Sequence, residues 1–320
     1  MQALWLEDQS LSFRTHAPRP SPGHGQARIQ MTLAGVCSTD LELQRGYYPF
    51  TGIPGHEFVG IVADSPDDSA WVGQRVVGEI NIACGECAPC KSGLQRHCEH
   101  RKALGIHDWN GAFAEYLVLP LSNLHAVPAH VPDEMAVFTE PLAAAGEILE
   151  QVDTKPGNQV LVIGAGRLGQ LVAAVLNETG CDLHVIARHP KQRELLARLN
   201  IKAVSEENLL PRGYDLIVDA SGTAGGFTLA CRLVRPRGKI IMKSTFKGKV
   251  ETNISQLVVD EVTLVGSRCG PFEPALRRLA KGVIDPRLLI EAIYPLQKGS
   301  QAFELAAQPG VLKVLLKPGG

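Results

Sequence analysis

The chain has 320 residues, 45 % of them hydrophobic and 20 % charged, and its formal net charge is −1. A balance so close to neutral gives no reason to expect nucleic acid or an acidic membrane surface as a partner. No apolar run approaches the roughly 18 residues of a membrane span, and the N-terminus lacks the features of an export signal. We therefore expect a cytoplasmic protein that is long enough for two domains.

Residues 1 to about 140 consist of short alternating segments, such as EFVGIVAD and AEYLVLP, interrupted by glycine and proline. This pattern predicts an irregular, mostly β domain. After Pro156 and Gly157, short apolar runs alternate with helical stretches; the runs are QVLVIGAG, DLHVIAR, YDLIVDAS, GKIIMKS and VTLVGS. That alternation predicts a parallel sheet covered by helices. The fold class is therefore α/β with a separate β domain.

Two residues of the β domain are candidate ligands for a catalytic metal. Cys37 precedes Thr39 and Asp40, and His56 follows nineteen positions after Cys37. One thiolate and one imidazole make half of a catalytic zinc site, which normally has three protein ligands and an open fourth position. A third ligand must come from further along the chain, and we choose Glu140 in FTEPLAAAG. Taken singly, each of these residues also suits core packing or an ordinary turn.

Four cysteines lie close together within residues 83–100, with the spacing C-x2-C-x2-C-x7-C; they are Cys84, Cys87, Cys90 and Cys98. In a reducing compartment, clustered cysteines bind metals more often than they form disulfides. Four thiolates suit tetrahedral zinc and leave no open position for a substrate, so we expect a structural zinc site. An iron–sulfur cluster is the alternative.

A glycine-rich motif, G-x-G-x-x-G, ends the first strand of the α/β region and opens a helix. Its glycines are Gly164, Gly166 and Gly169, with Arg167 and Leu168 inside the motif. The glycines allow a tight turn and close approach of the backbone to a pyrophosphate, which then binds at the helix N-terminus. The motif therefore predicts a dinucleotide site.

The acidic residue that an NAD enzyme places roughly 20 residues further on is missing. Twenty-four positions after Gly164 stands Arg188, followed by His189, Lys191 and Arg193. A basic cluster suits a 2′-phosphate, which accepts charge-assisted hydrogen bonds. We expect NADP(H) rather than NAD(H); the alternative is that these residues form only the solvated start of a helix.

Several of these segments occur in an order that resembles the zinc-containing medium-chain alcohol and polyol dehydrogenases. The segments are GVCSTDLE, PGHEFVGIV, the four-cysteine lobe, GAFAEYLVLP, EPLAAA and VLVIGAGRLGQ. The resemblance covers essentially the whole chain. It implies a GroES-like β-barrel catalytic domain at 1–141, a doubly wound Rossmann coenzyme domain at 142–267, and a return of 268–320 to the catalytic domain.

The resemblance also implies roles for single residues. Cys37 and His56 match ligands of the catalytic zinc, and Glu140 matches the EPL glutamate of the polyol branch. Glu57 matches a glutamate that is itself a ligand in some members, so it remains the alternative third ligand.

Further roles concern the proton and the coenzyme. Thr39 is expected to begin a hydroxyl relay for the substrate's proton, and Asp40 to hold the far nitrogen of His56. Arg268 and Lys313 resemble positions near the nicotinamide and the pyrophosphate.

The implied enzyme transfers a hydride between a secondary alcohol, polyol or sugar, or the corresponding carbonyl, and a nicotinamide cofactor, through a zinc-bound alkoxide. We expect two zinc ions per chain, a small-molecule substrate, and a homodimer or homotetramer paired through the coenzyme-domain sheets. The alternatives are a zinc-independent quinone or enone reductase on the same fold and a non-catalytic nucleotide-binding protein. The ligand set argues against both.

Overall fold

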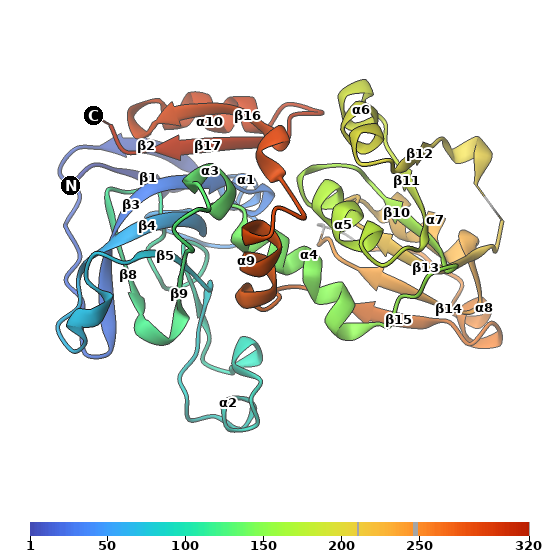
Figure 1. Ribbon diagram of the computed structural model, residues 1–320, viewed down its shortest axis with the longest axis horizontal. Coiled ribbons are helices and arrows are strands. Elements are labelled where there is room, and N and C mark those ends of the chain that lie inside the picture. The colour runs from blue at the N-terminus through green and yellow to red at the C-terminus, as the bar shows by residue number, and fades with distance from the viewer. Residues whose placement is uncertain (210, 246–248, 320) are drawn as a thin grey trace. The chain divides into compact units, whose positions relative to one another are not determined.

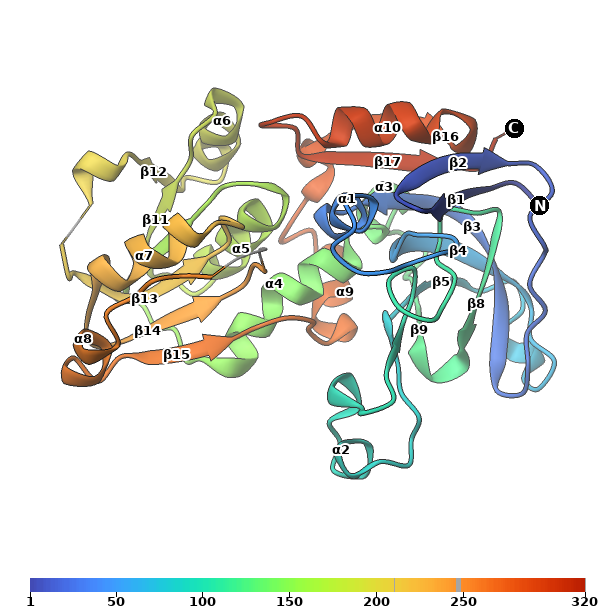
Figure 2. The ribbon, with the colours of Figure 1, turned by 180° about the vertical axis from the view of Figure 1, so that it is seen from behind.

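The computed structural model describes residues 1–209, 211–245 and 249–319. The chain separates into two compact units, Met1–Glu140 with Phe272–Gly320, and Pro141–Pro271. The ribbon is shown from two opposite sides (Figures 1 and 2). Within the described residues, no helix is long and apolar enough to cross a membrane.

The first unit is built around a seven-stranded sheet in which β3 has three partners. Strand β4 pairs along most of β3, β8 pairs with its first half, and β17 with its last residues. The sheet consists of β3 (Gln26–Val36), β4 (Glu57–Asp64), β5 (Arg75–Gly78), β8 (Tyr116–Pro120), β9 (Leu124–Ala126), β16 (Ile290–Pro295) and β17 (Lys313–Lys317). Because β17 lies beside β3, the C-terminal segment is part of this unit.

Two small hairpin-like sheets and five short helices complete the first unit. The two-stranded sheets are β1 (Ala3–Glu7) with β2 (Ser10–Arg14), and β6 (Asn81–Ile82) with β7 (Lys102–Ala103). The helices are α1 (Ser38–Gln44), α2 (Ala88–Lys91), α3 (Asp133–Ala136), α9 (Phe272–Ala280) and α10 (Gly299–Ala306).

The second unit is a six-stranded sheet whose strands all run parallel, in the order β12-β11-β10-β13-β14-β15. This is the doubly wound order of dinucleotide-binding folds, with the direction of winding reversed after the third strand. The strands are β10 (Gln159–Ile163), β11 (Asp182–Ile186), β12 (Lys202–Val204), β13 (Tyr214–Asp219), β14 (Val234–Met242) and β15 (Thr263–Gly266).

Helices cover both faces of this sheet, because the crossover from β10 to β11 and the crossover from β13 to β14 run in opposite directions and both are right-handed. Helix α5 packs on β10 and β11, and α7 packs on β13 and β14 (Figures 1 and 2). The helices are α4 (Thr139–Gln151), which begins in the first unit, α5 (Arg167–Asn177), α6 (Pro190–Arg198), α7 (Ala224–Leu233) and α8 (Ile254–Val259). The core between them is apolar, with Ile217 and Ile240 fully buried.

The glycine motif forms the turn from β10 into α5. Gly164 has φ +99°, a conformation that other residues rarely adopt, and a Cβ on Gly169 would lie 1.9 Å from the Gly164 carbonyl oxygen. A Cβ on Gly166, in contrast, would meet no atom of the described residues within 4 Å. Two glycines of the motif therefore serve the fold, and the third leaves space in front of the helix N-terminus.

This contrast yields a first prediction. Gly169→Ala should lower the free energy of unfolding by about 1–3 kcal/mol, the usual cost of forcing an extra methyl into packed atoms. Gly166→Ala is the matched control and should leave the thermal midpoint of the ligand-free protein almost unchanged. Thermal unfolding followed by circular dichroism measures both. Equal midpoints for the two variants would contradict the packing role of Gly169.

Candidate active site

The candidate zinc ligands meet because of the pairing between β3 and β4. The two strands are antiparallel, and Gly35 near the end of β3 pairs with Glu57, the first residue of β4. Cys37 follows β3 and His56 precedes β4, so the register brings them to the same end of the sheet. The Cys37 sulfur, a His56 ring nitrogen and a Glu57 carboxylate oxygen all lie within 4.8 Å of one another.

Asp40 orients both of the first two ligands. Cys37 is the N-cap residue of α1, and its N–H donates a hydrogen bond to Asp40 Oδ2 at 2.8 Å. The other carboxylate oxygen, Oδ1, lies 3.4 Å from His56 Nδ1. Asp40 is fully buried and His56 is 3 % exposed. With the Asp40 carboxylate facing Nδ1, Nε2 is the nitrogen that could bind a metal, and the holding role expected of Asp40 stays a prediction.

The surroundings of His56 favour a positive charge. Burial of the ring opposes protonation, but the Asp40 carboxylate and the Cys37 sulfur together raise the pKa of His56 well above its ordinary value. The same negative groups attract a metal cation, which takes the place of the proton when imidazole and thiolate become ligands. Thr39 stands beside this pair, with its hydroxyl oxygen 3.8 Å from the Cys37 sulfur.

Glu57 is buried, and the structure uses one of its two carboxylate oxygens. Glu57 Oε2 pairs with Lys313 Nζ at 2.5 Å, and both side chains are almost completely buried. Within the described residues, Oε1 has no hydrogen-bond partner. A Cβ on Gly35 would lie 2.3 Å from Oε2, so only glycine leaves room for this carboxylate. A buried carboxylate that lies with a thiol and an imidazole and keeps one oxygen unsatisfied fits a zinc ion.

Glu140 and Lys313 are placed differently from the group around Cys37. Glu140 lies half-buried in the first turn of α4, and its carboxylate does not belong to the group of ligand atoms that includes Glu57. The amino group of Lys313 is held by Glu57 and lies 5.8 Å from the ring centre of Phe138. The expected roles of Glu140 at zinc and of Lys313 at a pyrophosphate both stay predictions.

The four cysteines of the lobe at 83–100 converge on one point, with all their sulfur atoms within 4.8 Å of one another. Cys87 is the N-cap residue of α2 and Cys90 lies within that helix. The sulfurs of Cys87 and Cys90 are 3.4 Å apart, and those of Cys84 and Cys98 are 3.5 Å apart. Four thiolates at 2.3 Å from a tetrahedral zinc would lie about 3.8 Å apart. Sulfurs this close suit one tetrahedral ion better than a cluster of several irons.

The thiols of this lobe have unequal acidity. Backbone N–H groups of Glu86 and Cys87 lower the pKa of Cys84 to about 6, whereas burial and the neighbouring Cys87 thiol raise the pKa of Cys90 to about 12. A cation bound among these sulfurs would favour the deprotonated form of the thiols, as metal binding to cysteine requires.

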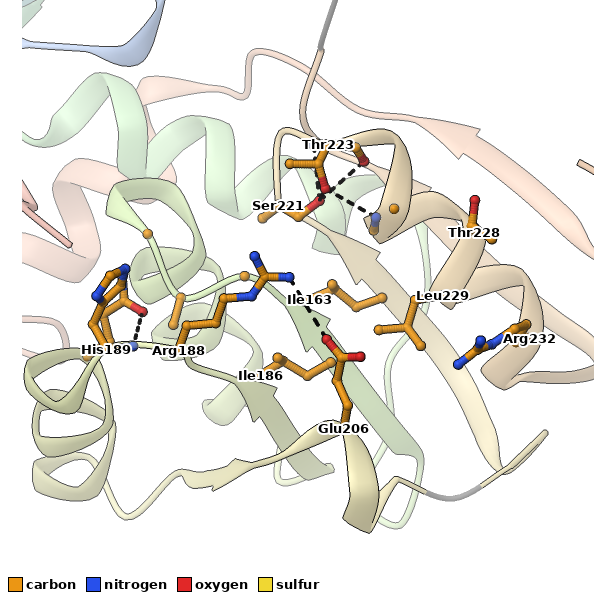
Figure 3. A pocket seen from close by; sticks show the side chains of 17 residues that line it. Ile163, Ile186, Arg188, His189, Glu206, Ser221, Thr223, Thr228, Leu229 and Arg232 are labelled. Atoms are coloured by element: carbon orange, nitrogen blue, oxygen red, sulfur yellow. Dashed lines mark hydrogen bonds and ion pairs between the residues drawn. The ribbon is translucent and has the colours of Figure 1, made fainter. Parts of the chain in front are cut away.

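A pocket of about 520 Å³ lies in the second unit, at the carboxyl ends of the central strands (Figure 3). Ile163, Ile186 and Leu229 form its apolar side, and Gly164 and Gly166 form its edge at the start of α5. The open space in front of Gly166, at the N-terminus of α5, fits the pyrophosphate of a dinucleotide. Arg167 and Leu168 are the first two residues of α5.

The basic residues expected at a 2′-phosphate are only partly in this pocket. Arg188 and His189 line it, whereas Lys191 and Arg193 are not among its lining residues. The Arg193 guanidinium donates to the Ala187 carbonyl oxygen at 3.0 Å and so supports the end of β11. Arg268 follows β15, where its carbonyl oxygen accepts a hydrogen bond from Lys243 Nζ at 2.7 Å.

Sequence reasoning missed several residues that line the pocket. Glu206 and Arg232 lie on its walls, and Ser221 and Thr223 follow β13 at its edge (Figure 3). Glu206 comes two residues after β12, a three-residue strand that is not among the apolar runs named in the sequence. That strand had to be paired with β11 before the position gained meaning.

Comparison with known proteins identifies the family to which the chain is similar. The family model described as alcohol dehydrogenase GroES-like domain matches residues 23–129, and the model described as zinc-binding dehydrogenase matches residues 168–281. L-Galactonate-5-dehydrogenase of Escherichia coli is 30 % identical over 89 % of each chain. Sorbitol dehydrogenase of Halalkalibacterium halodurans is 29 % identical over 94 % of each chain.

Solved structures are similar over almost the whole chain. The RspB alcohol dehydrogenase of E. coli, complexed with NADH, is 28 % identical with a TM-score of 0.92, and the match covers 99 % of both chains. A Sinorhizobium meliloti protein described as a zinc-binding dehydrogenase and bound to NADP is 26 % identical with a TM-score of 0.90, again over 99 % of both chains.

The chain therefore belongs to the zinc-type medium-chain alcohol and polyol dehydrogenase family. It is an oxidoreductase of the class that acts on alcohols with a nicotinamide cofactor. The predicted fold class, a GroES-like β-barrel domain with a Rossmann-type parallel sheet, is confirmed.

The geometry around Asp40 predicts the effect of a conservative change. Asp40→Asn should reduce the affinity for the catalytic zinc by about 10–100-fold, because the amide no longer fixes His56 and Cys37 as a carboxylate does. Competition with a chromogenic zinc chelator measures the affinity. Glu42→Gln, on the same helix, is the control and should retain the metal as the unmodified protein does. An unchanged affinity in Asp40→Asn would refute the orienting role.

Proposed function

We propose that the protein oxidises a secondary alcohol group of a polyol, sugar or sugar acid, or reduces the corresponding ketone, with zinc and NADP(H). The observation that carries this proposal is the group formed by Cys37, His56 and a buried carboxylate with an unpaired oxygen. The substrate class is supported by relatives named for sorbitol and L-galactonate.

The third protein ligand in this proposal is a carboxylate. The proximity of Glu57 to Cys37 and His56 favours Glu57, and Glu140 is the alternative. These residues would hold a zinc ion, and the Lewis acidity that it would supply makes the hydroxyl of an alcohol easier to deprotonate. Thr39, beside the Cys37 sulfur, relays the alcohol's proton: its oxygen takes that proton while its own hydroxyl proton passes to water. Asp40 keeps His56 in the tautomer that can bind the metal.

The two units have separate roles in this proposal. Residues 1–141 and 268–320 form the catalytic domain, and residues 142–267 bind the coenzyme. The pyrophosphate binds at Gly166 and the start of α5, and Arg188 with His189 receives the 2′-phosphate of NADP(H). The four-cysteine lobe holds a second, structural zinc. Because its ligands must remain reduced thiolates, we assign the protein to the cytoplasm.

A homodimer is supported by the edge of the second unit's sheet. Within the described part of the chain, β15 pairs with β14 alone, and Leu264 on it is an exposed apolar residue. Helix α8 adds Ile254, Val258 and Val259, of which Val259 is 80 % exposed. An open strand edge flanked by apolar side chains suits pairing with the same edge of a second copy. A homotetramer is the alternative.

Zinc content and turnover test the proposed activity together. The protein should contain two zinc ions per chain, and Cys37→Ser and Cys98→Ser should each contain one. Cys37→Ser should also lose turnover by on the order of a thousandfold, because a Lewis-acid metal contributes several kcal/mol to the reaction.

The assay uses polyols, sugars and sugar acids with each coenzyme, and elemental analysis counts the zinc. Cys231→Ser, which changes a cysteine of the second unit, should keep both ions and full activity. Full turnover in Cys37→Ser would refute the zinc mechanism.

The coenzyme preference is tested at Arg188. The unmodified enzyme should show a higher kcat/KM with NADP than with NAD, and Arg188→Ala should lose about tenfold or more of the NADP value, the equivalent of one or two charge-assisted hydrogen bonds. The NAD value should change much less. Steady-state kinetics with both coenzymes measures this, and a preference for NAD in the unmodified enzyme would overturn the proposal.

The oligomer is tested by placing a charge on the open edge. Leu264→Lys should shift the protein toward monomer, because burying an unpaired ammonium in an interface is unfavourable. Leu199→Lys, the same change at another exposed leucine of the second unit, is the control. Sedimentation velocity measures the assembly. If both variants keep the assembly of the unmodified protein, β15 does not form the interface.

A further inference from the structure

A carboxylate stands next to the cation that we assign to the 2′-phosphate. Glu206 Oε1 lies 3.9 Å from Arg188 Nη2, and both residues line the coenzyme pocket. In the close-up, the two side chains point toward each other across the pocket (Figure 3). Among the residues that line this pocket, all of them described by the structure, Glu206 is the only acidic one.

The register of two parallel strands explains why Arg188 and Glu206 lie close together. Ile186, the last residue of β11, pairs with Val204, the last residue of β12. Arg188 and Glu206 each follow two residues after those strand ends. They therefore lie side by side at the carboxyl edge of the sheet. The acid that Rossmann enzymes usually place after the second strand is absent here, because Ala187 and Arg188 follow β11. The neighbouring strand supplies an acid to the same region.

The pair is weak enough to be broken by a coenzyme. The side chains of Arg188 and Glu206 are 79 % and 55 % exposed, and exposed ion pairs contribute little. Arg188 can therefore turn to a doubly charged phosphate, which attracts it more strongly than one carboxylate does. Glu206 then remains close to that phosphate and repels it, because like charges a few ångströms apart disfavour each other.

Without the phosphate, the same carboxylate becomes an acceptor. A ribose 2′-hydroxyl is a donor, and a carboxylate at this edge of a Rossmann sheet can accept its hydrogen bond. We propose that Glu206 sets the coenzyme selectivity of this enzyme. Its carboxylate accepts a hydrogen bond from the 2′-hydroxyl of NAD(H) and weakens the binding of NADP(H). The preference for NADP(H) is therefore modest. This inference rests on the proposed binding of the 2′-phosphate by Arg188.

Two small ligands isolate the 2′ position. Adenosine 2′,5′-bisphosphate and adenosine 5′-monophosphate differ only by the 2′-phosphate, and calorimetric titration of the zinc-loaded, full-length protein gives the dissociation constant of each. Glu206→Gln removes the charge but keeps the shape. It should bind the bisphosphate several-fold more tightly and the monophosphate several-fold more weakly. The ratio of the two constants should then move by about tenfold, the scale of one charged contact in a solvent-exposed site.

Glu207→Gln is the matched control. Glu207 is the next residue, is exposed, and is not among the residues that line the pocket. Glu207→Gln therefore has the same net charge as Glu206→Gln but leaves the carboxylate beside Arg188 in place. It should keep the ratio of the unmodified protein. Steady-state kinetics of Glu206→Gln should show the same direction of change in kcat/KM for NADP relative to NAD.

The possible outcomes distinguish the role of Glu206 from the proposed binding of the 2′-phosphate by Arg188. If Arg188→Ala leaves the ratio of the two ligands unchanged, the phosphate site at Arg188 is wrong. If Arg188→Ala changes the ratio but Glu206→Gln does not, the phosphate site stands and the role of Glu206 is refuted. If Glu206→Gln strengthens the binding of both ligands equally, Glu206 acts only on the common 5′-phosphate and the inference is also refuted.

Discussion

One buried carboxylate holds the candidate zinc site together. Asp40 binds the backbone N–H of Cys37 through one oxygen and faces His56 through the other, so a single side chain joins the end of β3 to the residue before β4. Both contacts lie away from water, where an unpaired charge is costly. The charge of Asp40 is therefore balanced only when His56 is protonated or a cation is bound nearby. This constraint makes the site receptive to a metal and keeps its ligands in place.

The pair formed by Glu57 and Lys313 is a second buried charge beside Cys37 and His56, and it too is balanced by a neighbouring group. Lys313 comes from β17 in the C-terminal segment, and Glu57 begins β4, so the pair connects distant parts of the chain inside the first unit. Gly35 makes room for it. One carboxylate oxygen is neutralised by the lysine and the other is left for a ligand. A buried charge is thereby tolerated, and the acid is held where a third zinc ligand is needed.

Local sequence patterns predicted the elements that depend on near neighbours. The four cysteines are spaced so that one loop can surround an ion, and the glycine motif must turn tightly between β10 and α5, which Gly164 and Gly169 do. The α/β alternation predicted the parallel sheet for the same reason, since each strand and helix is specified by its own run of residues. The place of Glu57 beside Cys37 and of Glu206 beside Arg188 depended instead on which strands pair and in what register.

By itself, the sequence determined the chemical types available to this protein: thiolates and an imidazole for zinc, glycines for a pyrophosphate, and an arginine in place of the usual acid. These are properties of single residues and of short spacings. Only the tertiary structure decided which carboxylate lies with Cys37 and His56, which basic residues reach the coenzyme pocket, and that an acid shares it with Arg188. The physical reason is that these side chains are brought together by strand pairing between segments far apart in the chain, and a one-residue shift in register would separate them.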